Sequence, residues 1–215
     1  IPAGVFNLVM GRGSVIGDPL VNHPGINAIS FTGSQGVGAR IAQQCAVNLK
    51  KVQLEMGGKN PQIILDDADL AQAVELSVQS AFFSTGQRCT ASSRLIVTDG
   101  IYGKFVEAVQ ARMATLKIGD ALQAGIDIGP VSSLSQLQQD LDYVAIGQAE
   151  GAQLASGCTR LERTTEGFYM APALLLDTTS AMRINREEVF GPVASVIRVK
   201  DYEAALAESN HTPFG

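Results

Sequence analysis

The chain has 215 residues, of which 46% are hydrophobic and 17% charged, an ordinary globular composition that suffices for one large domain or parts of two. Its formal net charge is −5, and the basic residues are scattered rather than gathered in a stripe, which argues against a nucleic-acid partner. No apolar run approaches the roughly 20 residues of a membrane span, and no signal-peptide pattern opens the chain. We therefore expect a soluble, cytoplasmic protein without a membrane partner.

Three cysteines, Cys45, Cys89 and Cys158, are too few and too widely spaced for a disulfide framework or a metal site. No metal is expected, and at least one thiol is free to do chemistry. The chain opens without Met at Ile1, runs at once into a strand-like segment, and stops at Gly215 just after a helical one. This pattern predicts a piece of a longer chain.

Apolar runs bounded by Gly, Pro and Asp alternate with helical periodicity, which predicts an α/β protein with mostly parallel strands. Strands are predicted at residues 5–10, 26–31, 52–54, 62–65, 95–97 and 193–199. Helices are predicted at 70–82, 102–113 and 134–144, and loops at 119–130 and 156–168. Ser34 and Asp69 are placed to cap helices. A domain change is predicted at residues 55–59, where a Gly-Gly pair follows an apolar strand, dividing the chain into residues 1–56 and 57–215.

Two glycine-rich turns could accept a phosphate. Gly11, Gly13 and Gly17 follow the first predicted strand, but their spacing also suits a plain turn into a helix. Residues 31–38, Phe-Thr-Gly-Ser-Gln-Gly-Val-Gly, lie where a strand ends and a helix begins, and a helix N-terminus attracts anions. A serine cap with glycines that ease helix packing explains this second segment equally well.

Three further segments place reactive side chains in turns. Glu55 ends an apolar strand before two glycines, so partial desolvation could raise its pKa to suit a general base, unless it is an exposed strand-end carboxylate. Cys89 lies in a loop of small residues, where Arg88 and loop N–H groups could lower its pKa. The alternative for a cysteine is burial without reactivity, which suits Cys45 on the apolar face of its helix. Residues 186–192, Arg-Glu-Glu-Val-Phe-Gly-Pro, could be a surface turn.

These segments occur together in the order that the aldehyde dehydrogenase superfamily shows. Residues 31–38 resemble its F-T-G-S segment, 54–59 its L-E-[LM]-G-G-K segment, 86–89 its G-Q-x-C segment, and 187–192 its E-E-[VI]-F-G-P segment. The resemblance extends over residues 4–215. It implies a parallel-sheet aldehyde dehydrogenase fold, with the C-terminal part of a Rossmann-like cofactor-binding domain in residues 1–56 and a catalytic domain in 57–215.

The resemblance also implies the roles of individual residues. Cys89 would attack the aldehyde, a hydride would pass to NAD or NADP, and Glu55 would activate water to hydrolyse the thioester. Glu188 would hold the nicotinamide ribose beside Phe190, Thr32 and the Met56 carbonyl would orient the nicotinamide, and Ser34 would meet the pyrophosphate. The expected cofactor-binding residues are Thr32, Gly33, Ser34, Gly38, Met56, Glu188 and Phe190.

The Cys89 N–H would supply half of an oxyanion hole, and the other half resembles an asparagine expected upstream of Ile1. Because that residue and the first cofactor-binding strands are expected outside this chain, we expect the isolated chain to be inactive. The full protein should be a dimer or tetramer. Residues 82–95 look most like members that oxidise α-ketoglutarate semialdehyde, closer than betaine or retinal aldehyde members.

Two other hypotheses remain open at this point. A thiol hydrolase or acyltransferase would pair Cys89 with a histidine, but His23 and His211 lie outside any motif. Alternatively, the isolated chain is a non-catalytic fragment that serves folding or assembly. Binding of a nicotinamide dinucleotide would separate the dehydrogenase from the hydrolase.

Overall fold

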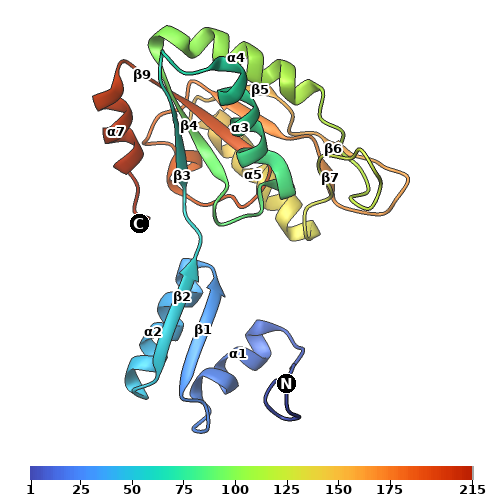
Figure 1. Ribbon diagram of the computed structural model, residues 1–215, viewed down its shortest axis with the longest axis vertical. Coiled ribbons are helices and arrows are strands. Elements are labelled where there is room, and N and C mark those ends of the chain that lie inside the picture. Colours follow the sequence, from blue (N-terminus) through green and yellow to red (C-terminus); the bar gives the residue numbers. More distant parts are fainter. Residues whose placement is uncertain (215) are drawn as a thin grey trace. The chain divides into compact units, whose positions relative to one another are not determined.

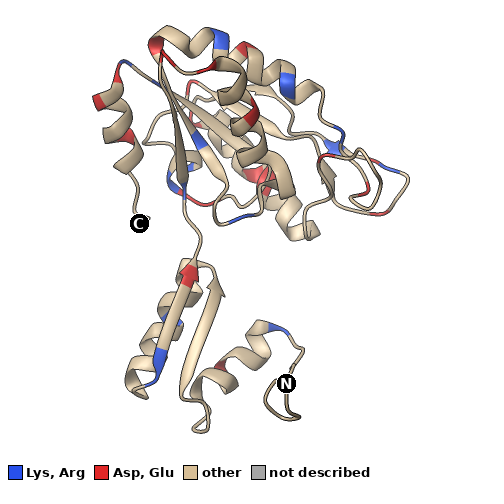
Figure 2. Ribbon diagram, in the orientation of Figure 1, with Lys and Arg blue, Asp and Glu red and all other residues tan. Residues whose placement is uncertain are grey.

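The computed structural model describes residues 1–214, which divide into two compact units at the Gly57-Gly58 pair. The first unit comprises residues 1–57 and the second begins at Gly58 (Figure 1). What each unit binds stays a prediction. Lys and Arg residues are spread over both units and interspersed with Asp and Glu, without a continuous basic stripe (Figure 2). Within residues 1–214, no helix combines the length and the apolar character needed to cross a bilayer.

The first unit is a small α/β layer. Its elements are α1 (Gly13–Asn22), β1 (Ala28–Gly33), α2 (Gln35–Val47) and β2 (Lys51–Met56). The two strands pair in parallel, and α2 connects them and packs on both, as expected for a βαβ unit. Three buried residues form its core, Val21, Ile41 and Cys45. Cys45 is fully buried, as predicted from the apolar face of its helix.

The predicted strand at residues 5–10 is wrong. Residues 1–12 contain no strand, and the large apolar side chains from Val5 to Met10 are exposed. A strand needs a neighbour for its backbone N–H and C=O groups, and the only ladder in the first unit joins β1 to β2. The glycine turn expected after that strand is wrong as well, because Gly13 and Gly17 lie inside α1.

The second unit is built on a five-stranded sheet with the order β3-β4-β9-β8-β5. These strands are β3 (Asn60–Ile64), β4 (Ser92–Thr98), β9 (Val193–Val199), β8 (Ala173–Leu176) and β5 (Gln153–Ser156). All neighbours are parallel except β5 and β8, which are antiparallel. A separate antiparallel ribbon pairs β6 (Arg160–Leu161) with β7 (Tyr169–Met170).

Helices cover both faces of this sheet. They are α3 (Leu70–Phe82), α4 (Asp99–Ala114), α5 (Leu134–Ala149), α6 (Arg183–Arg186) and α7 (Tyr202–Asn210), with a short 3₁₀ turn, η1 (Phe83–Gly86), after α3. In β8, Leu174 packs in a core cluster with α3 and α4, whereas Ala173 and Leu175 pack in a second cluster with α5 and α6. Because successive strand residues point to opposite faces, the two clusters lie on opposite sides of the sheet.

The predicted fold class, α/β with mostly parallel strands, is confirmed. The other five predicted strands are present, as are the helices predicted at 70–82, 102–113 and 134–144 and the predicted helix that carries Cys45, which is α2. The Asp69 carboxylate caps α3 by accepting from the Gln72 N–H. Four strands were not predicted, β5 to β8, and β6 falls inside the predicted loop at 156–168. They have only two to four residues each, too few for an alternating pattern to be recognised.

Candidate active site

The predicted site residues of the first unit gather at the carboxyl ends of its two strands. Thr32 lies opposite Glu55 and Gly33 opposite Met56 in the parallel register. Ser34 follows directly as the N-cap residue of α2. Ligands of parallel α/β sheets bind at this edge, beyond the carboxyl ends of the strands.

The start of α2 has free donors. Ser34 occupies the cap position, yet its side chain accepts no capping hydrogen bond, so the N–H groups of the first turn are not satisfied by it. Gly38 is buried, and a Cβ there would lie 2.5 Å from Met56 Sδ. Gly38 therefore eases the packing of α2, as one sequence interpretation predicted, but Ser34 forms no side-chain cap, and anion binding at the first turn stays a prediction.

Glu55 is exposed, which contradicts the partial desolvation predicted for it. Its carboxylate accepts a hydrogen bond from Gln53 Nε2 at 3.4 Å, from the same strand. The physical reason is that the first unit has a single two-stranded sheet, so β2 has a neighbour on one edge only. Within its own unit, Glu55 is thus a solvated carboxylate at a strand end.

Cys89 is exposed in a loop of residues 83–91, here called the cysteine loop. Exposure separates it from the buried, unreactive cysteine that Cys45 exemplifies. Asn60, the first residue of β3, donates from Nδ2 to the carbonyl oxygens of Cys89 at 2.6 Å and of Ala91 at 3.2 Å. Sequence reasoning missed Asn60, although it lies one position beyond the matched segment 54–59.

The cysteine loop is also held from its other end. Ser84, Thr85 and Gly86 all have positive φ, between 54° and 64°, which makes a tight left-handed turn. The side chain of Gln87 then ties the loop to the turn before α5, accepting from the Ser132 N–H at 3.1 Å and donating to Ser132 Oγ at 3.0 Å. The loop is therefore fixed by two amide side chains, Asn60 and Gln87.

Arg88 does not act as the sequence suggested. Its guanidinium donates at 2.8 Å to the carbonyl oxygens of both Gln79 and Ser80 in the last turn of α3. The Gln79 carbonyl also accepts from the Phe83 N–H, and a cation is favourable at a helix C-terminus. Arg88 is thus a helix cap, and neither an ion pair nor an orientation toward the Cys89 thiol is observed for it.

Two adjacent carboxylates open residues 187–192, the acidic loop, and they differ in their surroundings. Glu187 accepts from Tyr143 Oη at 2.6 Å and from two nitrogens of Arg183 at 2.9 Å, and these bonds lower its pKa to about 2. Glu188 is half-buried, and burial raises its pKa, opposed by the Gly58 N–H and by Lys59. Glu187 is engaged in the fold, whereas Glu188 is available to a ligand.

The cysteine loop and the acidic loop meet in one cleft. Its lining includes Gly86 and Arg88 from the former and Glu188 and Phe190 from the latter. Phe190 is 38% exposed and has a φ of +58°. The loops are in direct backbone contact, since a Cβ on Gly86 would overlap the carbonyl oxygen of Gly191.

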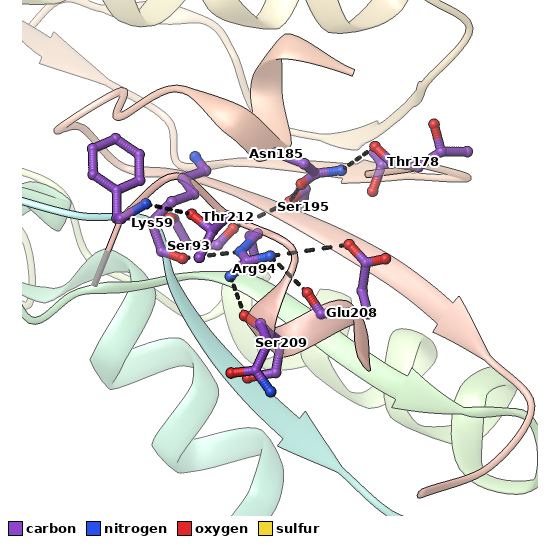
Figure 3. Close-up of polar contacts among 12 residues, drawn as sticks. Lys59, Ser93, Arg94, Thr178, Asn185, Ser195, Glu208, Ser209 and Thr212 are labelled. Atoms are coloured by element: carbon purple, nitrogen blue, oxygen red, sulfur yellow. Dashed lines mark hydrogen bonds and ion pairs between the residues drawn. The ribbon is translucent and has the colours of Figure 1, made fainter. Parts of the chain in front are cut away.

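A buried cation, Arg94, binds a backbone carbonyl next to a residue that lines this cleft, Gly58 (Figure 3 shows the contacts of Arg94). Arg94 is fully buried in β4 and donates to the carbonyls of Lys59 at 2.9 Å, Glu208 at 3.1 Å and Ser209 at 3.0 Å. The Lys59 side chain is also buried, and burial together with Arg94 lowers its pKa to about 7, opposed by Glu188 and Glu187. Arg94 thereby fixes the backbone beside Gly58, whose N–H binds Glu188.

The histidines do not form a nucleophile–base pair that the structure records. His23 lies in the first unit, and its Nδ1 accepts from the Gly25 N–H at 3.0 Å. His211 is exposed just after α7. No observation on the described residues favours a histidine-assisted thiol enzyme.

Residues 1–215 match the aldehyde dehydrogenase family over their whole length. The chain is 48% identical to the alpha-ketoglutaric semialdehyde dehydrogenase of Bacillus subtilis and 39% identical to the succinate-semialdehyde dehydrogenase [NADP(+)] of Escherichia coli. Each match covers all of this chain and 44% of the relative, so the chain spans less than half the length of these proteins.

Two solved structures similar to this chain are also of aldehyde dehydrogenases. Betaine aldehyde dehydrogenase from Staphylococcus aureus in complex with NAD+ matches with a TM-score of 0.96 and 36% identity, over 100% of this chain and 43% of that one. Lactaldehyde dehydrogenase from Escherichia coli matches with a TM-score of 0.92 and 39% identity, over 97% of this chain and 44% of that one. The predicted fold is confirmed, and the chain belongs to the aldehyde dehydrogenase family.

Proposed function

We propose that this chain carries the reacting residues of an NAD(P)-dependent enzyme that oxidises an aldehyde to the carboxylic acid. The observation that supports it best is the exposed Cys89, presented by a loop that Asn60 and Gln87 hold in a chain of this family. Cys89 is the nucleophile and Glu55 the general base. The roles of all the individual site residues belong to this proposal.

The chemistry runs in two stages. The Cys89 sulfur bonds to the aldehyde carbon, and the Cys89 N–H donates to the oxygen that becomes negative. A bound nicotinamide would supply the hydride acceptor for that carbon, and loss of the hydride would leave a thioester on Cys89. Glu55 then takes a proton from water, the resulting hydroxide adds to the thioester carbonyl, and the Cys89 thiolate leaves as the acid is released.

The residues on both units suit a dinucleotide. The open first turn of α2 offers N–H donors to a pyrophosphate near Ser34, with Gly33 free of a side chain at the strand end and Gly38 allowing the helix to lie close to β2. Thr32 and the Met56 carbonyl would orient the nicotinamide. Glu188 can accept from ribose hydroxyls, because its neighbour Glu187 satisfies the nearby arginine and tyrosine. Phe190 would pack beside it.

The finer proposal concerns the substrate, a short aldehyde with a terminal carboxylate such as α-ketoglutarate semialdehyde. Its support is the 48% identity with the Bacillus subtilis relative. Since Arg88 is used as a helix cap, the substrate carboxylate would be recognised by other donors. Comparing kcat/KM for α-ketoglutarate or succinate semialdehyde with that for uncharged aldehydes of equal length tests this, and equal or better values for the uncharged set reject it.

The central test uses two substitutions in the full-length protein. Cys89→Ser should abolish aldehyde oxidation while dinucleotide affinity stays within a few-fold, because serine is a far weaker nucleophile. Glu55→Gln should keep a burst of reduced dinucleotide but slow steady-state turnover by about 10² to 10⁴. Cys158→Ser is the matched control, since it removes a thiol outside both loops and should leave turnover near normal. Normal turnover by Cys89→Ser, or no slowing by Glu55→Gln, would reject the assigned role.

Assembly into a dimer or tetramer and a cytoplasmic location belong to the same proposal.

A further inference from the structure

Helix α5 carries two glutamine–aspartate pairs of the same design but opposite exposure. Gln136 donates to Asp140 and Gln138 donates to Asp142, each from Nε2 to Oδ1 at 2.8 Å and each four residues apart. Asp142 belongs to the pair that is exposed, whereas Asp140 is fully buried. Because carboxylates are almost never fully buried without a partner, the inner pair calls for a physical account.

The inner pair contacts the acidic loop at two points. Gln136 Nε2 donates a second hydrogen bond to the carbonyl oxygen of Val189 at 3.0 Å, which also accepts from Gln139 Nε2 at 2.8 Å. The backbone of Gly191 lies directly on the Asp140 carboxyl group, since a Cβ at Gly191 would overlap it. These contacts hold the residues on either side of Phe190, and Val189 follows Glu188 in the chain.

The second carboxyl oxygen of Asp140 is buried and has no hydrogen-bond partner within residues 1–214. Burial raises the pKa of Asp140 to about 7, although the bond from Gln136 opposes the rise. The titratable group that faces it from the segment after β5 is Cys158, whose own pKa is raised by burial and by Asp140. The acidic loop itself carries two titratable groups, Glu188 and Glu187, and Arg183 and Tyr143 bind the second of them.

We propose that Asp140 is a positioning residue for the acidic loop, whose uncharged carboxyl group keeps Glu188 and Phe190 where they receive the nicotinamide ribose. This inference rests on the proposed function. An ionised Asp140 would be a buried charge with an unsatisfied oxygen, and such a charge is relieved by movement of what covers it. Gly191 of the acidic loop is part of that cover. Ionisation therefore weakens dinucleotide binding without altering attack by Cys89.

The expected readout is a pH profile of dinucleotide affinity. If only the uncharged form binds, the apparent Kd of the full-length protein rises up to about tenfold for each pH unit above the pKa. Asp140→Asn stays uncharged and keeps the shape and the Oδ1 acceptor, so its Kd should change much less between pH 6 and pH 9. Asp142→Asn, on the exposed pair, should follow the unsubstituted protein. Lys59 adds its own pH dependence beside Glu188, so the difference between Asp140→Asn and the unsubstituted protein is the quantity to measure.

The experiment is calorimetric titration with NAD+ and NADP+ from pH 6 to pH 9. It is combined with hydrogen exchange of the backbone amides of residues 187–191 in the absence of dinucleotide. After correction for intrinsic exchange rates, protection in the unsubstituted protein should fall above pH 7, and Asp140→Asn should retain it. Identical pH profiles of loop protection for the two proteins would overturn the inference, whether or not dinucleotide binds. Absence of dinucleotide binding by the unsubstituted protein at every pH would instead overturn the proposed function and, with it, the ribose role given to the loop.

Discussion

The two units support their proposed site residues by different means. In the first unit, Thr32, Ser34 and Glu55 are exposed at the end of a two-stranded sheet whose buried core has three residues. In the second unit, the cysteine and acidic loops rest on two large core clusters and on the buried side chains of Arg94 and Asp140. Asn60 and Gln136 donate hydrogen bonds to backbone carbonyls of the two loops. Gln87, within the cysteine loop, accepts from the Ser132 N–H.

The two units also differ in the atoms that lie next to their closely packed glycines. At Gly86 in the second unit, the close contacts are with backbone carbonyls, which cannot move without the segments they belong to. The close contacts in the first unit, at Gly33 and Gly38, are with the side chains of Phe31 and Met56. Because packed backbone yields less than a flexible side chain, an added methyl group should cost more at Gly86 than at Gly38.

The largest effect is expected from Gly86→Ala. A Cβ there would overlap the Gly191 carbonyl oxygen and lie 2.8 Å from the Ala81 carbonyl oxygen, at a φ of +64° that L residues disfavour. Overpacking and left-handed strain together should lower the free energy of unfolding by about 3 kcal/mol or more. Urea unfolding measures this. Gly103→Ala is the control, since Gly103 lies in α4 with nothing near its Cβ position, and it should not destabilise. A loss below about 1 kcal/mol for Gly86→Ala would show that the two loops are not tightly packed together.

A smaller effect is expected from Gly38→Ala in the first unit. The new Cβ would meet Met56 Sδ at 2.5 Å, so the methionine must turn aside, at a cost of about 1 to 2 kcal/mol that the better helix propensity of alanine partly offsets. Hydrogen exchange of α2 amides reports the local stability. In a Met56→Ala background the obstacle is gone, and Gly38→Ala should then stabilise α2. Equal destabilisation in both backgrounds would mean that Met56 is not what Gly38 accommodates.

Local sequence patterns predicted the elements that make their own contacts. The apolar run after Pro192 located β9 at its observed bounds, and the apolar stripe of 70–82 together with Asp69 located α3 and its cap. The order of the motifs that contain Cys89 and Glu188 also predicted the family of the chain. Such patterns depend on residues within a few positions of one another, and the structure reproduces them.

Contacts between distant segments could not be predicted in the same way. Asn60 reaches Cys89 across 29 positions, Gln87 reaches Ser132 across 45, and Gln136 reaches Val189 across 53. A lone amide carries no periodic signal, so its partner appears only when the chain is folded. Arg88 shows the converse error, because its closeness to Cys89 in sequence suggested an electrostatic role, whereas its observed hydrogen bonds are to the end of α3.

The smallest effect compares the two predicted helix caps, and it tests whether the second unit is also the better fixed at its helix ends. Asp69 accepts from the Gln72 N–H at 3.0 Å, so Asp69→Ala should destabilise α3 by about 1 kcal/mol, the usual value of a side-chain cap. Ser34 makes no such bond, so Ser34→Ala should change the stability of α2 by only a few tenths of a kcal/mol. Hydrogen exchange in the first turns of both helices measures the pair in one protein. If Ser34→Ala costs as much as Asp69→Ala, then Ser34 caps α2 in solution, and fewer free N–H groups remain there for a pyrophosphate.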